Sequence, residues 1–164
     1  MDDRDYDEFV RSRADALLRL AYLLTGDHHR AEDALQDVLE RMYVRWRHIR
    51  GSPDAYARRA LANRAIGQAR WRRRHGEAPL TAATEPRLDD PAAEISIRHA
   101  VLAVLGELSQ RQRAAVVLRY LEELPITEVA EILTCSEATV KSHCVRGLAK
   151  LRQALPLSNQ RLEM

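Results

Sequence analysis

The sequence of 164 residues lacks features that several common classes of protein require. Its two cysteines, Cys135 and Cys144, are too few for a disulfide framework and favour a reduced protein in the cytoplasm. It has no apolar run as long as a signal peptide or a membrane-spanning helix, so we expect no membrane insertion. No stretch alternates apolar and polar residues in the way that predicts a β-strand.

Enzyme motifs are also missing. The sequence contains no Ser/His/Asp set, no paired-carboxylate motif and no glycine-rich phosphate loop, so we expect neither catalytic residues nor a cofactor. A zinc site formed by Cys135, His143 and Cys144 is conceivable. It would lack a fourth ligand, and Cys144 belongs to an apolar helix stripe, so we expect no metal site either.

What the sequence does contain is helix-forming residues and strongly segregated charge. Only six glycines and six prolines, among many alanines, leucines and arginines, predict an all-α protein. The net charge of +2 hides an uneven distribution. Basic and acidic side chains number six and eleven in residues 1–44, ten and one in 45–75, one and five in 76–94, and nine and seven in 95–164. Such segregation indicates partners of both charge signs.

The length allows one domain or two small ones. Apolar periodicity predicts helices over residues 6–24, 28–46, 53–74, from about 92, 110–122, 126–133 and 137–155. The stretch from Gly76 to Pro91 has three prolines, no apolar period and a negative charge. We therefore predict two small helical domains, residues 1–75 and 95–164, joined by a flexible acidic linker at 76–94.

The end of the chain predicts a helix-turn-helix. A short amphipathic helix over 126–133 is followed by the turn Thr134-Cys135-Ser136, and Ser136 is a suitable N-cap for a long helix. The long helix should bury the stripe Val140, Cys144, Leu148, Leu151 and Leu155. Its outer face is basic, as a reader of the DNA major groove requires. The simpler alternative is a helical bundle whose last helix happens to be basic.

Residues 128–133 (EVAEIL) followed by 138–142 (ATVKS) resemble the C-terminal domain of bacterial sigma-70 factors, which reads the -35 promoter element. They resemble LuxR-type regulators almost as closely. Thr134 departs from the sigma pattern, because the turn often has glycine there and a β-branched residue is poorly suited to positive φ. Helix phase places Lys141, Ser142, Val145 and Arg146 toward the bases, with Arg119, Thr139, His143 and Lys150 nearer the phosphates.

Two faces of the first half carry opposite charge. The helix over 28–46 should expose an acidic face, which would meet a basic protein partner or only water. The helix over 53–74 exposes many arginines interleaved with Tyr56 and Trp71. Arginines and aromatic rings together favour binding of single-stranded or distorted nucleic acid over a merely solvated face.

This half resembles the promoter-melting domain of the extracytoplasmic-function (ECF) class of sigma factors, through residues 31–38 (AEDALQDV) and through Tyr56, Asn63 and Arg64. The resemblance implies a set that docks on the clamp helices of RNA polymerase: Glu32, Asp33, Gln36, Asp37 and Glu40. It also implies a set that reads the -10 element and captures an unstacked base: His48, Arg50, Gly51, Ser52, Tyr56, Arg59, Asn63, Arg64 and Arg70.

The resemblance implies a promoter-specificity subunit. Its partners would be core RNA polymerase, through the clamp helices and the flap, promoter DNA, and an anti-sigma factor. The alternative is a stand-alone LuxR-type regulator, but such a protein would place a domain with β-strands ahead of the helix-turn-helix, and no strand pattern is present.

The segregated charge leads to a hypothesis on the free chain. The segment 45–75 carries a net charge of +9 and is followed directly by the acidic linker. At low ionic strength we expect the linker, and the second domain with it, to fold back over the arginine-rich helix. Exposed ion pairs contribute little, so this closed form also needs an apolar contact between the domains.

Overall fold

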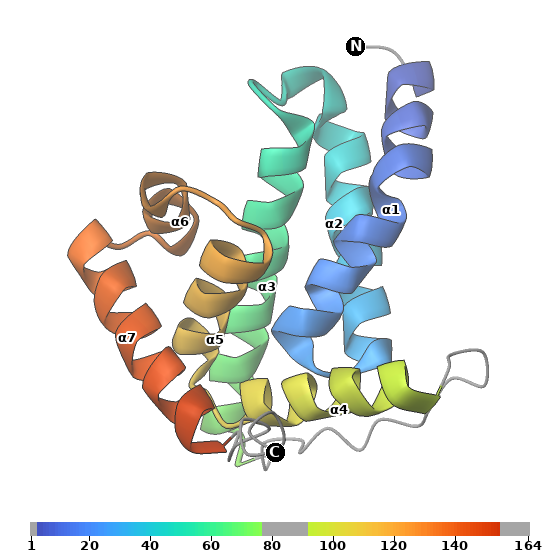
Figure 1. Ribbon diagram of the computed structural model, residues 1–164. Helices are drawn as coiled ribbons and strands as arrows, with labels where there is room; N and C mark the ends of the chain where they lie inside the picture. Colours follow the sequence, from blue (N-terminus) through green and yellow to red (C-terminus); the bar gives the residue numbers. More distant parts are fainter. Residues whose placement is uncertain (1–2, 77–91, 155–164) are drawn as a thin grey trace.

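The computed structural model describes residues 3–76 and 92–154, with side chains described for 3–76 and 99–154. The predicted all-α fold is confirmed, since these residues form helices and no strand. Helices α1, α2 and α3 stand side by side, α5, α6 and α7 pack together beyond α3, and α4 crosses beneath (Figure 1). Most of the predicted linker lies outside the described residues, as do the side chains that open the next helix and the tail from Leu155.

The N-terminal half contains α1 (Asp3–Thr25), α2 (His28–Arg45), a short 3-10 turn (Trp46–His48) and α3 (Pro53–Arg74). Gly26 ends α1 at a φ of +74°, and the Asp27 carboxylate accepts a hydrogen bond of 2.9 Å from the backbone N–H of Arg30. The Ser52 hydroxyl accepts one of 3.3 Å from the N–H of Ala55. These caps confirm the predicted starts of α2 and α3.

The C-terminal half contains α4 (Ala92–Gly106), α5 (Gln110–Val116), a π-helical turn (Val117–Leu121), α6 (Ile126–Leu133) and α7 (Glu137–Ala154). A capping box starts α5, because the side chains of Ser109 and Gln112 each accept a hydrogen bond from the other's backbone N–H. The helix predicted over 110–122 is therefore α5 with its continuation into the π-helical turn.

The predicted helix-turn-helix is confirmed in α6, α7 and the turn between them. Thr134 ends α6 with φ 53° and ψ 51°, so a β-branched residue occupies the left-handed conformation. The Ser136 hydroxyl accepts a hydrogen bond of 3.1 Å from the backbone N–H of Thr139 and caps α7.

The buried stripe of α7 differs from the predicted one. Val140, Cys144 and Gly147 are buried, while Leu148 and Leu151 are only half-buried. A Cβ atom at Gly147 would meet the side chain of Val116 on α5, so the absence of a side chain lets the two helices approach closely. Leu148 was predicted as part of the stripe because it is apolar, whereas glycine gives no signal in an apolar period.

Candidate nucleic-acid interface

The outer face of α7 is an exposed strip of polar, basic and apolar side chains. Lys141, Ser142, Val145 and Arg146 are all exposed, and Val145 keeps 67% of its surface accessible. They lie opposite the buried residues Val140, Cys144 and Gly147 of the same helix. An exposed valine between hydrogen-bonding groups suits contact with base edges better than contact with water.

The four residues predicted near phosphates differ in how firmly they are held. Thr139 is exposed, and its hydroxyl lies 2.8 Å from that of Ser136. Lys150 donates a hydrogen bond of 3.1 Å to the Gln112 side chain. Arg119 is half-buried and donates one of 3.3 Å to the carbonyl of Leu124. The side chains of Lys150 and Arg119 are therefore anchored to other parts of the C-terminal half rather than free in solvent.

His143 is half-buried beside two arginines. Burial lowers the pKa of its imidazole below the ordinary value of 6.5, and the charges of Arg111 and Arg146 lower it further. His143 is therefore neutral at pH 7 in the free protein, and it offers a hydrogen-bonding group at the edge of the strip rather than a fixed positive charge.

The set predicted for the -10 element follows α3 and the loop before it. His48, Arg50, Gly51 and Ser52 are exposed in that loop, where Gly51 has a φ of +85°. Arg59, Asn63 and Arg70 are exposed along α3, whereas Tyr56 and Arg64 are half-buried. Ser52 has a second task, since its hydroxyl caps α3.

A groove of about 970 Å³ runs between α2 and α3. It brings together Tyr56, Arg59, Asn63 and Arg64 of the predicted set. Nine further lining residues were not in that set, among them Arg41, Val44, Arg45 and Trp71. Val44 is 79% exposed and Trp71 is 54% exposed, with the Trp71 ring stacked 4.1 Å from that of His75. Of these residues, Val44 could have been identified from the sequence, because it is an apolar residue at an outward position of α2.

The set predicted to meet polymerase lies on α2. Glu32, Asp33, Gln36 and Glu40 are exposed, and the Gln36 amide donates a hydrogen bond of 3.0 Å to the Glu40 carboxylate. Asp37 differs, because its carboxylate is half-buried and pairs with Arg41 at 3.1 Å and with Arg64 at 3.3 Å. Asp37 therefore joins α2 to α3.

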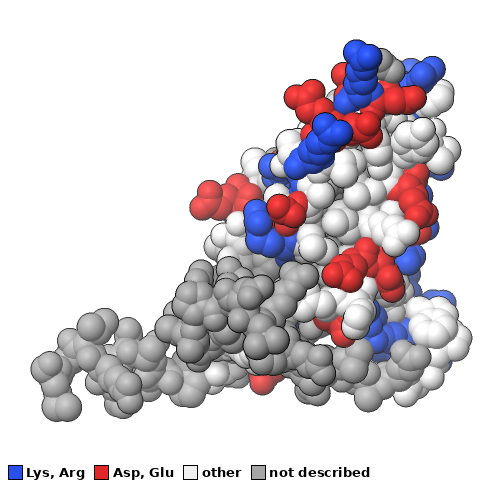
Figure 2. Space-filling view, turned by 90° about the vertical axis from the view of Figure 1, so that its right-hand side faces the viewer, with Lys and Arg blue, Asp and Glu red and all other residues white. Residues whose placement is uncertain are grey.

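Figure 2 shows the side of the molecule that carries α1 and α2. Acidic side chains gather there in several groups, separated by uncharged surface. Within residues 3–76 and 99–154, no group of three or more His, Cys, Asp or Glu side chains is arranged to hold a metal ion. None of the helices in the described part of the chain combines the length and apolar character needed to cross a membrane.

The two halves match two regions of one protein family. Residues 9–75 match sigma-70 region 2, and residues 98–151 match sigma-70 region 4. The chain is 40% identical over 154 residues to the RNA polymerase sigma-E factor of Streptomyces coelicolor, covering 92% of this chain and 86% of that protein. It is 30% identical over 156 residues to the ECF RNA polymerase sigma factor SigM of Mycobacterium tuberculosis, covering 94% and 79%. The chain belongs to the ECF class of sigma-70 factors.

A solved structure has the same fold. The sigma factor RpoE of Bartonella quintana, crystallised with the anti-sigma factor NepR, matches with a TM-score of 0.77 at 23% identity, covering 94% of this chain and 99% of that one. With region 2 ahead of the helix-turn-helix, the LuxR-type alternative is not supported. The sigma factor is a promoter-specificity subunit of RNA polymerase.

Proposed function

We propose that this sigma factor binds core RNA polymerase in the cytoplasm and directs it to promoters whose -35 element is read by α7 and whose -10 element is read by α3 and the loop before it. The proposal is supported by the presence of two separate surfaces suited to binding nucleic acid. They are the exposed strip of α7 and the arginine-lined groove beside α3. This role needs no catalytic group of the chain itself, because polymerase performs the chemistry.

The -35 element is duplex DNA, and an α-helix fits its major groove. Arg146 can donate two hydrogen bonds to a guanine, Lys141 and Ser142 can bond base edges, and Val145 offers an apolar surface to a thymine methyl group. Arg119, Thr139, His143 and Lys150 would then lie nearer the phosphates. Anchored side chains lose little conformational entropy on binding, which suits Arg119 and Lys150 to a positioning role.

The -10 element must be read as separated strands. Tyr56 and Trp71 supply aromatic surfaces on which unpaired bases can stack, and Arg59 supplies positive charge for the backbone. The exposed loop from His48 to Ser52 would receive an unstacked base, since a side chain at Gly51 would meet nothing within 4 Å and the loop has room.

We assign polymerase docking to α2. The exposed carboxylates of Glu32, Asp33 and Glu40 would repel DNA and attract a basic protein surface such as the clamp helices. Asp37 would act indirectly, by holding Arg64 in the groove beside α3. The flap of polymerase would hold the C-terminal half, which places α7 at the distance of the -35 element.

An anti-sigma factor is a further expected partner. The RpoE structure of similar fold contains the anti-sigma factor NepR. A partner that covered the acidic row of α2 would keep this sigma factor from polymerase by direct competition, without any change in the DNA-reading residues.

Co-purification with core polymerase tests the proposal. Asp33→Arg should reduce holoenzyme assembly at least about tenfold, because it places a positive charge against a basic surface. Asp15→Arg makes the same charge change at an exposed position of α1 and should assemble normally. Normal assembly of the Asp33 variant would remove α2 from the interface. Failure of the unaltered chain to support promoter-dependent transcription would end the proposal as a whole.

A further inference from the structure

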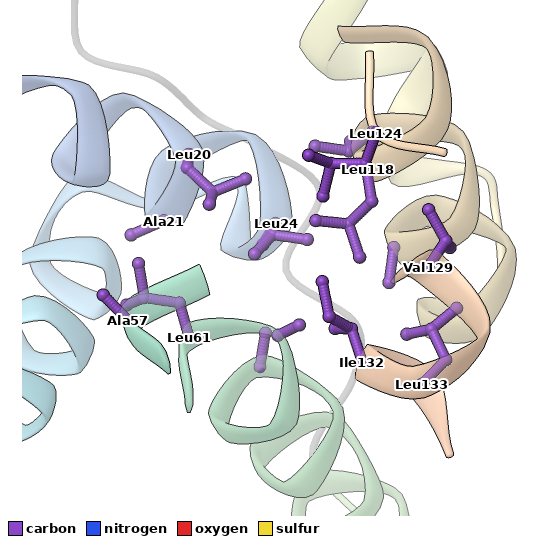
Figure 3. Close-up of a cluster of buried hydrophobic side chains, with 14 of the residues drawn as sticks. Leu20, Ala21, Leu24, Ala57, Leu61, Leu118, Leu124, Val129, Ile132 and Leu133 are labelled. Atoms are coloured by element: carbon purple, nitrogen blue, oxygen red, sulfur yellow. The ribbon is translucent and has the colours of Figure 1, made fainter. Parts of the chain in front are cut away.

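Helix α3 presents two different faces to its surroundings. Leu61 points into the buried apolar cluster that also contains Leu24 of α1 and Ile132 of α6, so the apolar contact between the two halves that a closed free chain requires is present (Figure 3). A second face of α3 lines the groove beside α2 with Ala60, Arg64, Gly67 and Trp71, which are three or four positions apart. Every residue that lines this groove belongs to α2 or α3, so the groove is separate from the packing of the two halves.

Gly67 keeps part of this groove open. A Cβ atom at Gly67 would meet no heavy atom within 4 Å. Trp71 follows one turn further along α3, and the exposed Val44 of α2 lines the same groove. Glycine destabilises the interior of a helix relative to alanine, so the open space has a cost in stability. The missing side chain leaves room beside the indole for a flat group.

The Trp71 ring has one face covered by His75. The two rings are stacked, with their centroids 4.1 Å apart and an angle of 21° between their planes. The Nδ1 atom of His75 donates a hydrogen bond of 2.8 Å to the carbonyl of Trp71, which holds the imidazole at the end of α3. His75 does not line the groove, and 54% of the Trp71 surface is exposed. The indole can therefore offer its other face to a second stacking partner in the groove.

Gln68 brings an unsatisfied polar group to the same place. Its side chain is half-buried and lines the groove, and its amide oxygen is buried without a hydrogen-bond partner. A buried acceptor without a partner costs free energy, and a ligand that supplied a donor would remove that cost once the amide turned toward it. Adenine matches an amide side chain, because glutamine can accept from its N6 amino group while donating to its N7 atom.

The charge of the groove suits an anionic ligand. Four arginines and one acid, Glu40, are among its lining residues. Arg41 and Arg64 both pair with a carboxylate of α2. Arg45 and Arg59 are exposed, and neither forms an ion pair within the part of the chain that the structure describes. One unpaired arginine from each helix is thus available for the phosphates that flank a base.

We propose that Val44, Gln68 and Trp71 form a base-binding slot that holds one unpaired adenine of the promoter strand, and that His75 is a positioning residue for the indole. The base stacks on Trp71, contacts Val44 and pairs its edge with the Gln68 amide. The slot rests on the proposed reading of the -10 element by α3. It adds a base-specific contact to that reading, about two helical turns beyond Asn63.

The test uses the full chain and two single-stranded tetranucleotides, one of deoxyadenosine and one of deoxycytidine. Of the two tryptophans, Trp46 is buried and Trp71 is exposed, so a base that stacks in the slot should quench the fluorescence of Trp71. The deoxyadenosine tetranucleotide should bind at least about fivefold more tightly than the deoxycytidine one, as expected for one good base contact. Trp71→Leu should abolish the quenching.

Two further substitutions separate the slot from general effects. Gly67→Leu should fill the slot and weaken binding of the deoxyadenosine tetranucleotide at least about fivefold, as expected for the loss of one stacked base. Gly106→Leu makes the same change at an exposed glycine of α4 and should bind as the unaltered chain does. Gln68→Leu should remove most of the preference for adenine, whereas Gln153→Leu, at an exposed position of α7, should keep it. Circular dichroism checks that each variant remains helical.

The positioning role of His75 is tested by rescue. His75→Ala removes the stacked ring and should weaken binding about twofold or more, because the indole is then less well held. His75→Phe restores an aromatic ring and should recover most of the affinity. Equal losses in the two variants would overturn the positioning role.

The remaining outcomes decide on the slot itself. Quenching that weakens in Gly67→Leu and persists in Gly106→Leu supports it. Equal binding by those two variants, or no quenching of the unaltered chain, overturns it. A preference for adenine that is absent, or that survives Gln68→Leu, overturns the assignment of the base. Promoter-dependent transcription by the unaltered chain with core polymerase is measured in parallel, so a failure of the proposed function is seen separately from a failure of the slot.

Discussion

A Cβ atom built on Gly147 of α7 would lie 2.7 Å from the Cγ2 atom of Val116 on α5. Val116 is 4% exposed, so its side chain is buried against its neighbours. We predict that Gly147→Ala lowers the free energy of unfolding by about 1–3 kcal/mol, because the added methyl group overpacks the contact between α5 and α7. Urea unfolding monitored by circular dichroism measures the change.

Gly67 provides the control for this prediction. It lies on the exposed side of α3, and a Cβ there would meet nothing within 4 Å. Gly67→Ala should raise the free energy of unfolding by about 0.5–1 kcal/mol, because alanine loses less backbone entropy in a helix. Similar effects of the two substitutions would contradict the close approach at Gly147.

The left-handed conformation of Thr134 predicts a stabilising substitution. A β-branched residue at a φ of 53° costs about 1–2 kcal/mol, and glycine removes that cost while adding some entropy to the unfolded chain. Thr134→Gly should therefore stabilise the protein by about 0.5–1 kcal/mol. Thr127→Gly, at an exposed helical position of α6, should destabilise it by about 0.3 kcal/mol, the difference between the helix propensities of threonine and glycine. A loss of stability in both variants would exclude strain at the turn.

The lowered pKa of His143 predicts how stability depends on pH. Its first cause is burial, followed by the charges of Arg111 and Arg146. The unfolded chain, whose histidine titrates near 6.5, then binds a proton more readily than the folded protein. Stability should be constant with respect to this group above pH 6.5 and fall as the pH drops toward the lower pKa of the folded state.

Urea unfolding at about pH 7.5 and about pH 5.5 checks this dependence. His143→Gln should lose less stability between the two pH values than the unaltered protein. His29→Gln, at an exposed histidine at the start of α2, should lose as much as the unaltered protein. If His143→Gln lost as much stability between the two pH values as the unaltered protein, another group would be responsible.

Arg146 and Lys150 should separate sequence preference from general affinity. Arg146→Ala removes a base contact and should cost about 1–3 kcal/mol at the preferred -35 sequence while affecting other sequences little. Lys150→Ala should weaken binding to all sequences alike. It should also reduce the salt dependence of binding by the amount expected from the loss of about one phosphate contact. Competition assays with duplexes that vary at single positions, at two salt concentrations, measure both. Uniform weakening by both substitutions would remove Arg146 from the base-reading set.

Local signals were sufficient to predict most helix boundaries. Apolar periodicity predicted the start of α3 at Pro53 and the observed bounds of α6, Ile126–Leu133. Caps and apolar stripes act within one or two turns, so the sequence near each boundary contains the necessary information. The exposed strip of α7 followed from the same periodicity, while the roles of its residues toward DNA remain predictions.

Contacts between distant residues could not be predicted in this way. Asp37 was grouped with an exposed acidic row, but it pairs with Arg64 of another helix. Arg113 has the sequence context of an exposed basic residue, yet it is buried against α1, where burial lowers its pKa to about 10. Such placements depend on how α1, α3 and α5 pack, and no periodicity within one helix reports on that packing.

The cluster shared by α1, α5 and α6 has a consequence for synthesis on the ribosome. Leu24 and the carbonyl of Leu23 obtain their partners only after residues up to Ile132 have been made. At about 5–20 residues per second, those partners are completed several seconds or more after α1. During this interval the nascent region 2 exposes the apolar end of α1, and Arg58 of α3 keeps its partner Asp54 but lacks its second partner, Glu122. The growing chain is therefore most prone to aggregation or to premature nucleic-acid binding before its own C-terminal half appears.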